Sequence, residues 1–123
     1  MINIYYSSEE EILHWEFNNT ITKSNILDSI EEIKEYSLSR SRLKIYCNSL
    51  NAKLDIKHTD LIEISQKAHS YMNLFDNIRL SVVVEAPKAT AFFMMTFMNL
   101  NDIRFKGKVF STLDAAKIWL NKF

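Results

Sequence analysis

Residues 80–100 read LSVVVEAPKATAFFMMTFMNL, and this stretch decides the fold. The run over 78–85 is apolar on both faces at its centre, which is typical of an interior strand covered by helices. Pro87 follows, at a position where the start of a helix tolerates a missing amide hydrogen. The apolar run over 90–100 is long enough for a helix. A strand followed directly by a helix indicates an α/β domain.

The flanking segments extend this alternation of strands and helices. Strands are predicted over residues 2–6, 12–17, 43–47, 78–85 and 108–110, and helices over about 23–37, 60–72, 90–100 and 113–123. The connection between the first two strands is too short for a parallel crossover, so they should pair antiparallel, with the first strand at or near an edge. We expect the strand over 78–85 to be the central one.

Turn and capping residues set the predicted boundaries. Asn18 and Asn19 predict a turn, because asparagine tolerates left-handed backbone angles. The third strand is expected to end near Asn48, before a loop over 49–59, and Gly107 marks a turn before the last strand. The candidate helix caps are Thr22, Asp60 together with Glu63, and Ser111 or Thr112.

The composition is that of one ordinary globular domain covering residues 1–123. Apolar residues make up 47% of the chain and charged residues 24%, and 15 basic residues balance 15 acidic ones. A net charge of zero gives no overall field to gather nucleic acid or an anionic membrane, so neither is expected as a partner. The basic cluster of Arg40, Arg42 and Lys44 is interpreted as the charged edge of a helix-to-strand turn.

The chain carries no sign of export or of a membrane span. Its single cysteine, Cys47, excludes an internal disulfide and is expected to be a buried, inert thiol in a reducing compartment. The first residues lack the pattern of a signal peptide, and no apolar run approaches ~20 residues. A cytoplasmic protein with no integral membrane association is therefore expected, and the abundance of Asn, Lys and Ile favours a bacterial source.

The predicted third helix is more apolar than a packed helix requires. Its Phe and Met side chains spread over an arc of roughly 220°, whereas a core-facing stripe needs only about 100°. Phe93 and Met95 lie on opposite borders of this arc, so at least one of them should be exposed in a monomer. Either a neighbouring helix or second subunit covers the excess, or an apolar ligand does. The candidate binding residues are Phe92, Phe93, Met95, Thr96 and Asn99.

Several segments together resemble a known family. They are Val82-Val83-Val84-Glu85-Ala86-Pro87, Ala91-Phe92, Met94 and Met98, and Val109 to Ala116 with Trp119-Leu120. This pattern resembles the SpoIIAA-like branch of the STAS superfamily, and Asn19-Thr20-Ile21-Thr22 is similar to that family's entry into its first helix. The resemblance implies a mostly parallel five-stranded sheet that begins with an antiparallel strand and carries about four helices.

The resemblance also directs attention to the loop before the second helix. Relatives of the anti-sigma-factor antagonist type are switched there by phosphorylation of a serine, whereas this chain has no Ser-Ser-Gly run. Thr59 is the hydroxyl closest to that position, and we interpret it as a helix cap. Relatives also place a glycine and an arginine where this chain has Phe93 and Thr96. The candidate loop residues are Asp55, Lys57, His58 and Thr59.

No pattern of reactive residues predicts an enzyme. The three histidines, His14, His58 and His69, fall on separate elements without partners at metal-ligand spacing, so no metal site is expected. The chain has one glycine and therefore no glycine-rich phosphate loop, and no cofactor is expected. A catalytic hypothesis rests only on the loop that holds Asp55, His58 and Asp60.

The sequence favours a non-catalytic binding or regulatory module. The leading hypothesis is protein-protein interaction, including self-association, through the third helix and the loop before the second helix. The alternative is a carrier or sensor of an apolar, lipid-like ligand, by analogy of fold alone. An enclosed apolar cavity would favour the carrier, whereas an exposed apolar patch would favour the partner.

Overall fold

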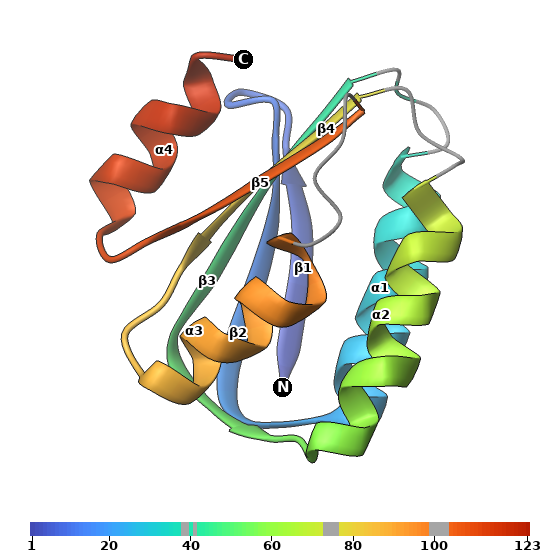
Figure 1. Cartoon of the computed structure of the whole chain (residues 1–123). Coiled ribbons are helices and arrows are strands. Elements are labelled where there is room, and N and C mark those ends of the chain that lie inside the picture. Colours follow the sequence, from blue (N-terminus) through green and yellow to red (C-terminus); the bar gives the residue numbers. More distant parts are fainter. Residues whose placement is uncertain (38–39, 41, 73–76, 99–103) are drawn as a thin grey trace.

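A five-stranded sheet with helices on both faces forms the computed structural model, which describes residues 1–37, 40, 42–72, 77–98 and 104–123 (Figure 1). The strands are β1 (Ile2–Ser7), β2 (Ile12–Thr22), β3 (Arg42–Asp55), β4 (Asn77–Val83) and β5 (Phe105–Phe110). The helices are α1 (Lys23–Ser37), α2 (His58–Met72), α3 (Pro87–Thr96) and α4 (Leu113–Asn121).

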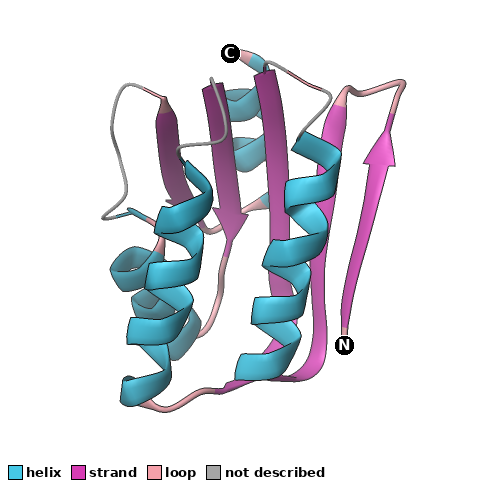
Figure 2. Cartoon of the chain, turned by 90° about the vertical axis from the view of Figure 1, so that its right-hand side faces the viewer, coloured by secondary structure: helices cyan, strands magenta, loops and turns pink. Residues whose placement is uncertain are grey.

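The strands lie in the sheet in their order along the chain, β1-β2-β3-β4-β5. β1 pairs antiparallel with β2, and the other neighbours pair in parallel. Figure 2 shows β1 as the outermost strand, which confirms the prediction from the short first connection. The central strand is β3 and not the one predicted over 78–85. β4 is buried on both faces, but it lies between β3 and β5.

β2 and β3 are longer than the sequence predicted. β2 continues to Thr22, and β3 continues to Asp55 through the segment expected to be a loop. The pairing slips between Glu16 and Asn18, where β3 carries one more residue than β2, so a bulge interrupts the simple alternation. Asn19 does have a positive φ of 62°, as asparagine permits, but it lies inside a strand and not in a turn.

The two faces of the sheet have separate cores. Aromatic and branched side chains fill the larger one, between the sheet and α1, α2 and α3, and Trp15, Phe17 and Phe93 are its largest fully buried members. Ser29 accepts a hydrogen bond from the Trp15 indole at 3.1 Å, so the buried N–H is satisfied. The smaller core, under α4, consists of Ile12, Tyr46, Val83, Ala116 and Leu120.

Local contacts explain where α1, α3 and α4 begin. Thr22 and Asn25 exchange hydrogen bonds at the start of α1, and Thr112 accepts one from the Ala115 amide at 3.2 Å, as predicted for two of the caps. Pro87 occupies the first turn of α3, also as predicted. That helix begins three residues before the predicted run over 90–100, and Thr96 is its last residue.

Two other predicted boundaries are wrong. α2 begins at His58, and the Asp60 carboxylate accepts a hydrogen bond from the Lys57 amide at 2.9 Å, so Asp60 lies inside the first turn. Thr59 also lies inside that turn and is not the cap. Gly107 lies in the middle of β5 and not in a turn. Glycine suits this position because a Cβ there would come within 2.7 Å of the Met98 sulfur.

Candidate functional site

A groove of about 130 Å³ opens between the end of β3 and α3, at the carboxyl ends of the parallel strands. This is the edge of an open α/β sheet where ligands and partners most often bind. One wall comes from the β3–α2 connection and the start of α2, and the other from α3. The lining residues are Leu54, Ile56, Lys57, His58, Leu61, Lys88, Ala91, Phe92 and Met95. We refer to this feature as the α3 groove.

The floor of the α3 groove is apolar and its rim is basic. Leu54 and Phe92 are buried at its base, while Lys57, His58 and Lys88 are exposed around it. No acidic side chain is among the described residues that line it. A groove of this kind suits an apolar side chain that is flanked by carboxylates.

The sequence-predicted residues of the third helix divide between the surface and the core. Met95 is 48% exposed and lines the α3 groove, whereas Phe93 has 0% exposure. The expectation that at least one border residue would be exposed is therefore confirmed. Phe92 reaches the groove only as part of its floor. Asn99 lies outside the described residues.

Phe93 and Thr96 cannot contact a partner at the surface in this structure, which corrects their selection as binding residues. Both have 0% exposure, because α3 turns this side toward the sheet. The Phe93 ring packs 5.7 Å from the Phe17 ring, centroid to centroid. The Thr96 hydroxyl is buried and has no hydrogen-bond partner among the described residues. The apolar surplus of α3 is thus used mainly for the core.

The predicted loop residues are all exposed, and they do not form one cluster. Lys57 and His58 line the α3 groove. Asp55 is the last residue of β3, and Thr59 is in the first turn of α2; neither lines the groove. The structure therefore places two of the four predicted loop residues in the same groove as the predicted helix. His58 belongs to no cluster of three or more His, Cys, Asp or Glu side chains in the described part of the chain.

Sequence reasoning missed Lys88 and Ala91 on α3 and Leu61 on α2 as residues of this site. Met95 follows Ala91 by four residues and Lys88 by seven, so the three share one side of a helix. This helical spacing can be recognised in the sequence. Lys88 was missed because the predicted helix began two residues after it, at residue 90, whereas α3 begins at Pro87.

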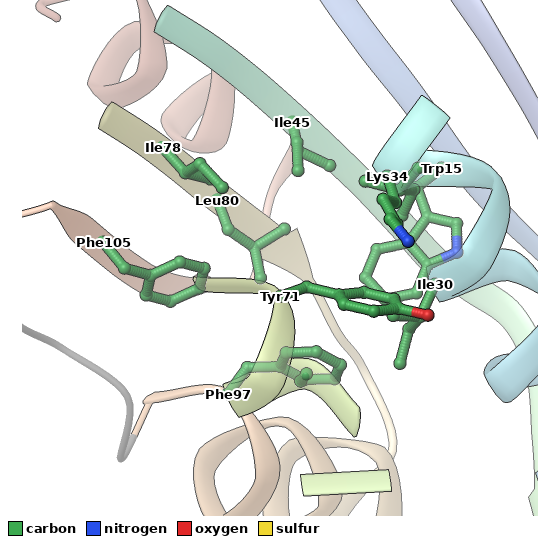
Figure 3. Close-up of a pocket in the computed structure, with 11 residues that line it drawn as sticks. Trp15, Ile30, Lys34, Ile45, Tyr71, Ile78, Leu80, Phe97 and Phe105 are labelled. Atoms are coloured by element: carbon green, nitrogen blue, oxygen red, sulfur yellow. The ribbon is translucent and has the colours of Figure 1, made fainter. Parts of the chain in front are cut away.

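A separate apolar cavity of about 50 Å³ lies between α1, α2 and the sheet (Figure 3). Figure 3 shows the Tyr71 side chain extended across it, with Phe97 on one side and strand residues such as Leu80 on the other. Lys34 lies at its border, with its ammonium 5.0 Å from the centre of the Tyr71 ring. The cavity is smaller than the ~150 Å³ of an apolar cavity that admits benzene. It has no room for an acyl chain in this conformation.

The groups with shifted pKa values lie away from the α3 groove. Burial raises the pKa of the Cys47 thiol well above its usual value, which fits the expected inert cysteine. Burial, with contributions from Cys47 and nearby carboxylates, raises the pKa of Tyr46 to about 12. Neither group therefore ionises near neutral pH, and neither is prepared to act as a nucleophile or base.

Comparison with known proteins identifies the fold. A structure of an uncharacterised protein of the DUF3478 family, with a SpoIIAA-like fold, from Shewanella loihica PV-4 superposes with a TM-score of 0.60. The two sequences are 12% identical, and the match covers 98% of this chain and 92% of the other. No family model and no curated protein matches the sequence. The chain therefore has a SpoIIAA-like α/β fold, as its sequence resemblance implied. No described helix is long and apolar enough to cross a membrane.

Proposed function

We propose that this protein is a non-catalytic interaction module that binds a protein partner at the α3 groove. The observation that carries the proposal is Met95 of α3, which is 48% exposed and lines an apolar groove; its chain neighbour Met94 is also 48% exposed. Covering one such side chain contributes roughly 1.5 to 3 kcal/mol. Methionine also adapts to partners of different shape, because its chain is unbranched and its sulfur is polarisable.

The rim specifies the chemistry of the partner. Lys57, His58 and Lys88 surround the floor, so a segment with an acidic residue on either side of an apolar one complements the groove. These rim charges mainly steer association and select the partner. The buried contact with Met95 and Phe92 would then hold it. A second copy of this chain is an alternative occupant, which the experiment below distinguishes.

The test uses a photoreactive amino acid at position 95 in the cells from which the protein comes. Irradiation should give a discrete adduct with a partner from Met95 and none from the matched position Ile118. Ile118 is 61% exposed on α4, on the other face of the sheet, and is the control for an exposed apolar side chain. An adduct with twice the mass of the chain would identify self-association.

A variant that introduces a negative charge provides the second arm. Met95→Glu should abolish the adduct formed from a second probe at Ala91, while leaving the melting temperature nearly unchanged because Met95 is half-exposed. Equal adducts from positions 95 and 118, or an adduct that survives Met95→Glu, would contradict the proposal. A sharp fall in melting temperature would show that Met95 serves the core.

The apolar cavity next to Tyr71 supports a second candidate, a sensor of a small apolar ligand. Its lining is apolar apart from the Lys34 ammonium and the Tyr71 hydroxyl. At about 50 Å³ it fits a group no larger than a few heavy atoms. Native mass spectrometry of freshly purified protein tests this candidate, because a bound small apolar molecule would appear as a fixed mass increment.

A further inference from the structure

Three positively charged residues lie side by side on the face of the sheet that α4 covers. Lys44 of β3 pairs with Arg79 of β4, and Arg79 pairs with Lys106 of β5. Neighbouring strands are ~4.8 Å apart, so the three backbone positions form a closely spaced row. Like charges directly opposite each other in a sheet are destabilising. The row therefore lowers the stability of the free protein.

Two further cations, Arg42 of β3 and Lys122 at the end of α4, lie next to this row. The Arg42 and Arg79 guanidinium carbons lie 4.2 Å and 4.1 Å from the centre of the Phe123 ring. Lys122 is the C-cap residue of α4. Figure 1 shows the end of α4 at the same end of the molecule as the starts of β3, β4 and β5. A pocket of about 300 Å³ opens there, lined by Arg79, Lys106, Trp119, Lys122 and Phe123. We call it the basic pocket.

The charges of the basic pocket are not neutralised within the described part of the chain. Salt bridges occur elsewhere in the molecule, but none of them involves Arg42, Lys44, Arg79, Lys106 or Lys122. Arg79 donates hydrogen bonds to the Asn77 side chain and the Ile78 carbonyl, both of them uncharged acceptors. Burial and the neighbouring Arg42 lower the pKa of Arg79, as repulsion between cations requires.

The carboxylates on this face, Glu10, Glu16 and Asp114, act on Tyr46 of β3 and do not line the basic pocket. Glu10, in the turn before β2, is held by His14 at 2.8 Å and Lys117 at 3.2 Å. Glu16 pairs with Asn48, four residues along β3 from Lys44. The C-terminus of α4 contributes only about half a negative charge. Against the three lining cations and the neighbouring Arg42 and Lys44 this partial charge is small, so the pocket retains a positive potential.

We propose that the basic pocket binds a compact anion with two or more negative charges, of the phosphorylated small-molecule or pyrophosphate class. Arg79 of β4, Lys106 of β5 and Lys122 at the end of α4 line one concave space, which suits a small ligand, and Arg42 and Lys44 of β3 lie next to them. Arginine and lysine together provide the donors that phosphate oxygens accept. An extended polymer is disfavoured, because the chain as a whole has a net charge of zero and offers no continuous basic track.

The experiment titrates the protein with inorganic pyrophosphate at constant ionic strength and measures heat and backbone amide shifts. The shifts should centre on residues of β4, β5 and the end of α4. Lys106→Gln should weaken binding about tenfold, and Arg79→Gln with Lys106→Gln should abolish it. The matched control, Lys57→Gln with Lys88→Gln, changes the net charge equally at the α3 groove and should leave the affinity unchanged.

Stability without ligand gives an independent readout. Lys106 is exposed and belongs to the repulsive row, so Lys106→Gln should keep or raise the melting temperature at low salt. Equal weakening by the control pair, or no binding of pyrophosphate at millimolar concentration, would overturn the proposal. So would tighter binding of a single-stranded oligonucleotide or of phosphatidylglycerol vesicles that is lost in the Arg79 and Lys106 double variant. Those outcomes would assign the pocket to a polymer or a membrane surface.

Discussion

The two faces of the sheet differ in what their side chains do. On the face under α1, α2 and α3, inward positions are almost entirely apolar, and aromatic rings such as Trp15, Phe17 and Phe93 contact one another. On the face under α4, a small apolar core adjoins a network of His14, Glu10 and Lys117 and the row of cations.

This difference shows how stability and recognition can be separated in one small domain. The larger core contains most of the buried apolar side chains, and burial of such side chains is the main favourable contribution to folding. The α4 face tolerates repulsive and partly exposed charges because it is not the main source of stability. Substitutions on the two faces should therefore have effects of different kinds and sizes.

The largest effect is expected from Phe93→Ala. The ring has 0% exposure and lies within 6.0 Å of the Phe17, Phe92 and Phe97 rings, so its removal should lower the free energy of unfolding by about 3 to 5 kcal/mol. The matched variant on the other face is Phe110→Ala, which should cost roughly 1 kcal/mol because that ring is only partly buried. Urea denaturation measures both values. Equal losses would abolish the distinction between the faces.

Gly107→Ala should have the second largest effect. The added Cβ would meet the Met98 sulfur at 2.7 Å, so Met98 must move within the larger core, at a cost of about 1 to 3 kcal/mol. In a double-mutant cycle with Met98→Ala, the cost of Gly107→Ala should largely disappear. Additive losses would mean that the strain comes from the backbone of β5 and not from this contact.

A smaller effect, dependent on pH, is expected on the α4 face. Hydrogen bonding to His14, and then to Lys117, lowers the pKa of Glu10 from its usual 4.5. A lowered pKa in the folded state means that the stabilisation is present above pH 4.5 and is lost as the pH falls below it. Because Glu10 is a surface residue, the loss should be no more than about 1 kcal/mol.

Glu10→Gln tests this dependence. The variant should be slightly less stable than the wild type at neutral pH, and the two proteins should converge in acid. Thermal unfolding at a series of pH values measures the difference. A constant difference at every pH would mean that Glu10 acts through packing or geometry and not through its charge.

The smallest effect is expected at Thr59. It is exposed in the first turn of α2 and is not the cap, so Thr59→Ala should change the free energy of unfolding by about 0.5 kcal/mol or less. Thr59→Glu should leave the adduct from position 95 intact, because Thr59 does not line the α3 groove. Mass spectrometry of protein from its native cells should find no phosphothreonine here. Its detection would indicate a surviving phosphorylation switch.

Much of the architecture could be predicted from local patterns. The alternation of Leu13, Trp15 and Phe17 with polar residues indicated one face of β2, and the short first connection gave the antiparallel edge. The second half of β3 was missed for two physical reasons. Asn48 and Asn51 disfavour strands locally, and the bulge beside them shifts the apolar alternation by one residue.

The candidate sites were less predictable because they depend on tertiary register. Met95 and the Lys57-His58 pair were found from helical spacing and from the family resemblance. The basic pocket was not found, because Lys44, Arg79 and Lys106 are far apart in the chain and meet only through the parallel pairing of three strands. Arg42 and Lys44 alone indicated nothing more than a charged turn.

β3 connects the two ends at which binding is proposed. Its first residue, Arg42, lies over the Phe123 ring of the basic pocket, and its last, Asp55, lies beside the α3 groove. Fourteen residues at ~3.3 Å each give a reach of ~45 Å. Molecules bound at opposite ends of this strand would not touch or compete, and the sheet would hold them at a fixed separation. With both proposed sites, the domain would act as a rigid spacer that holds two bound molecules at the same time.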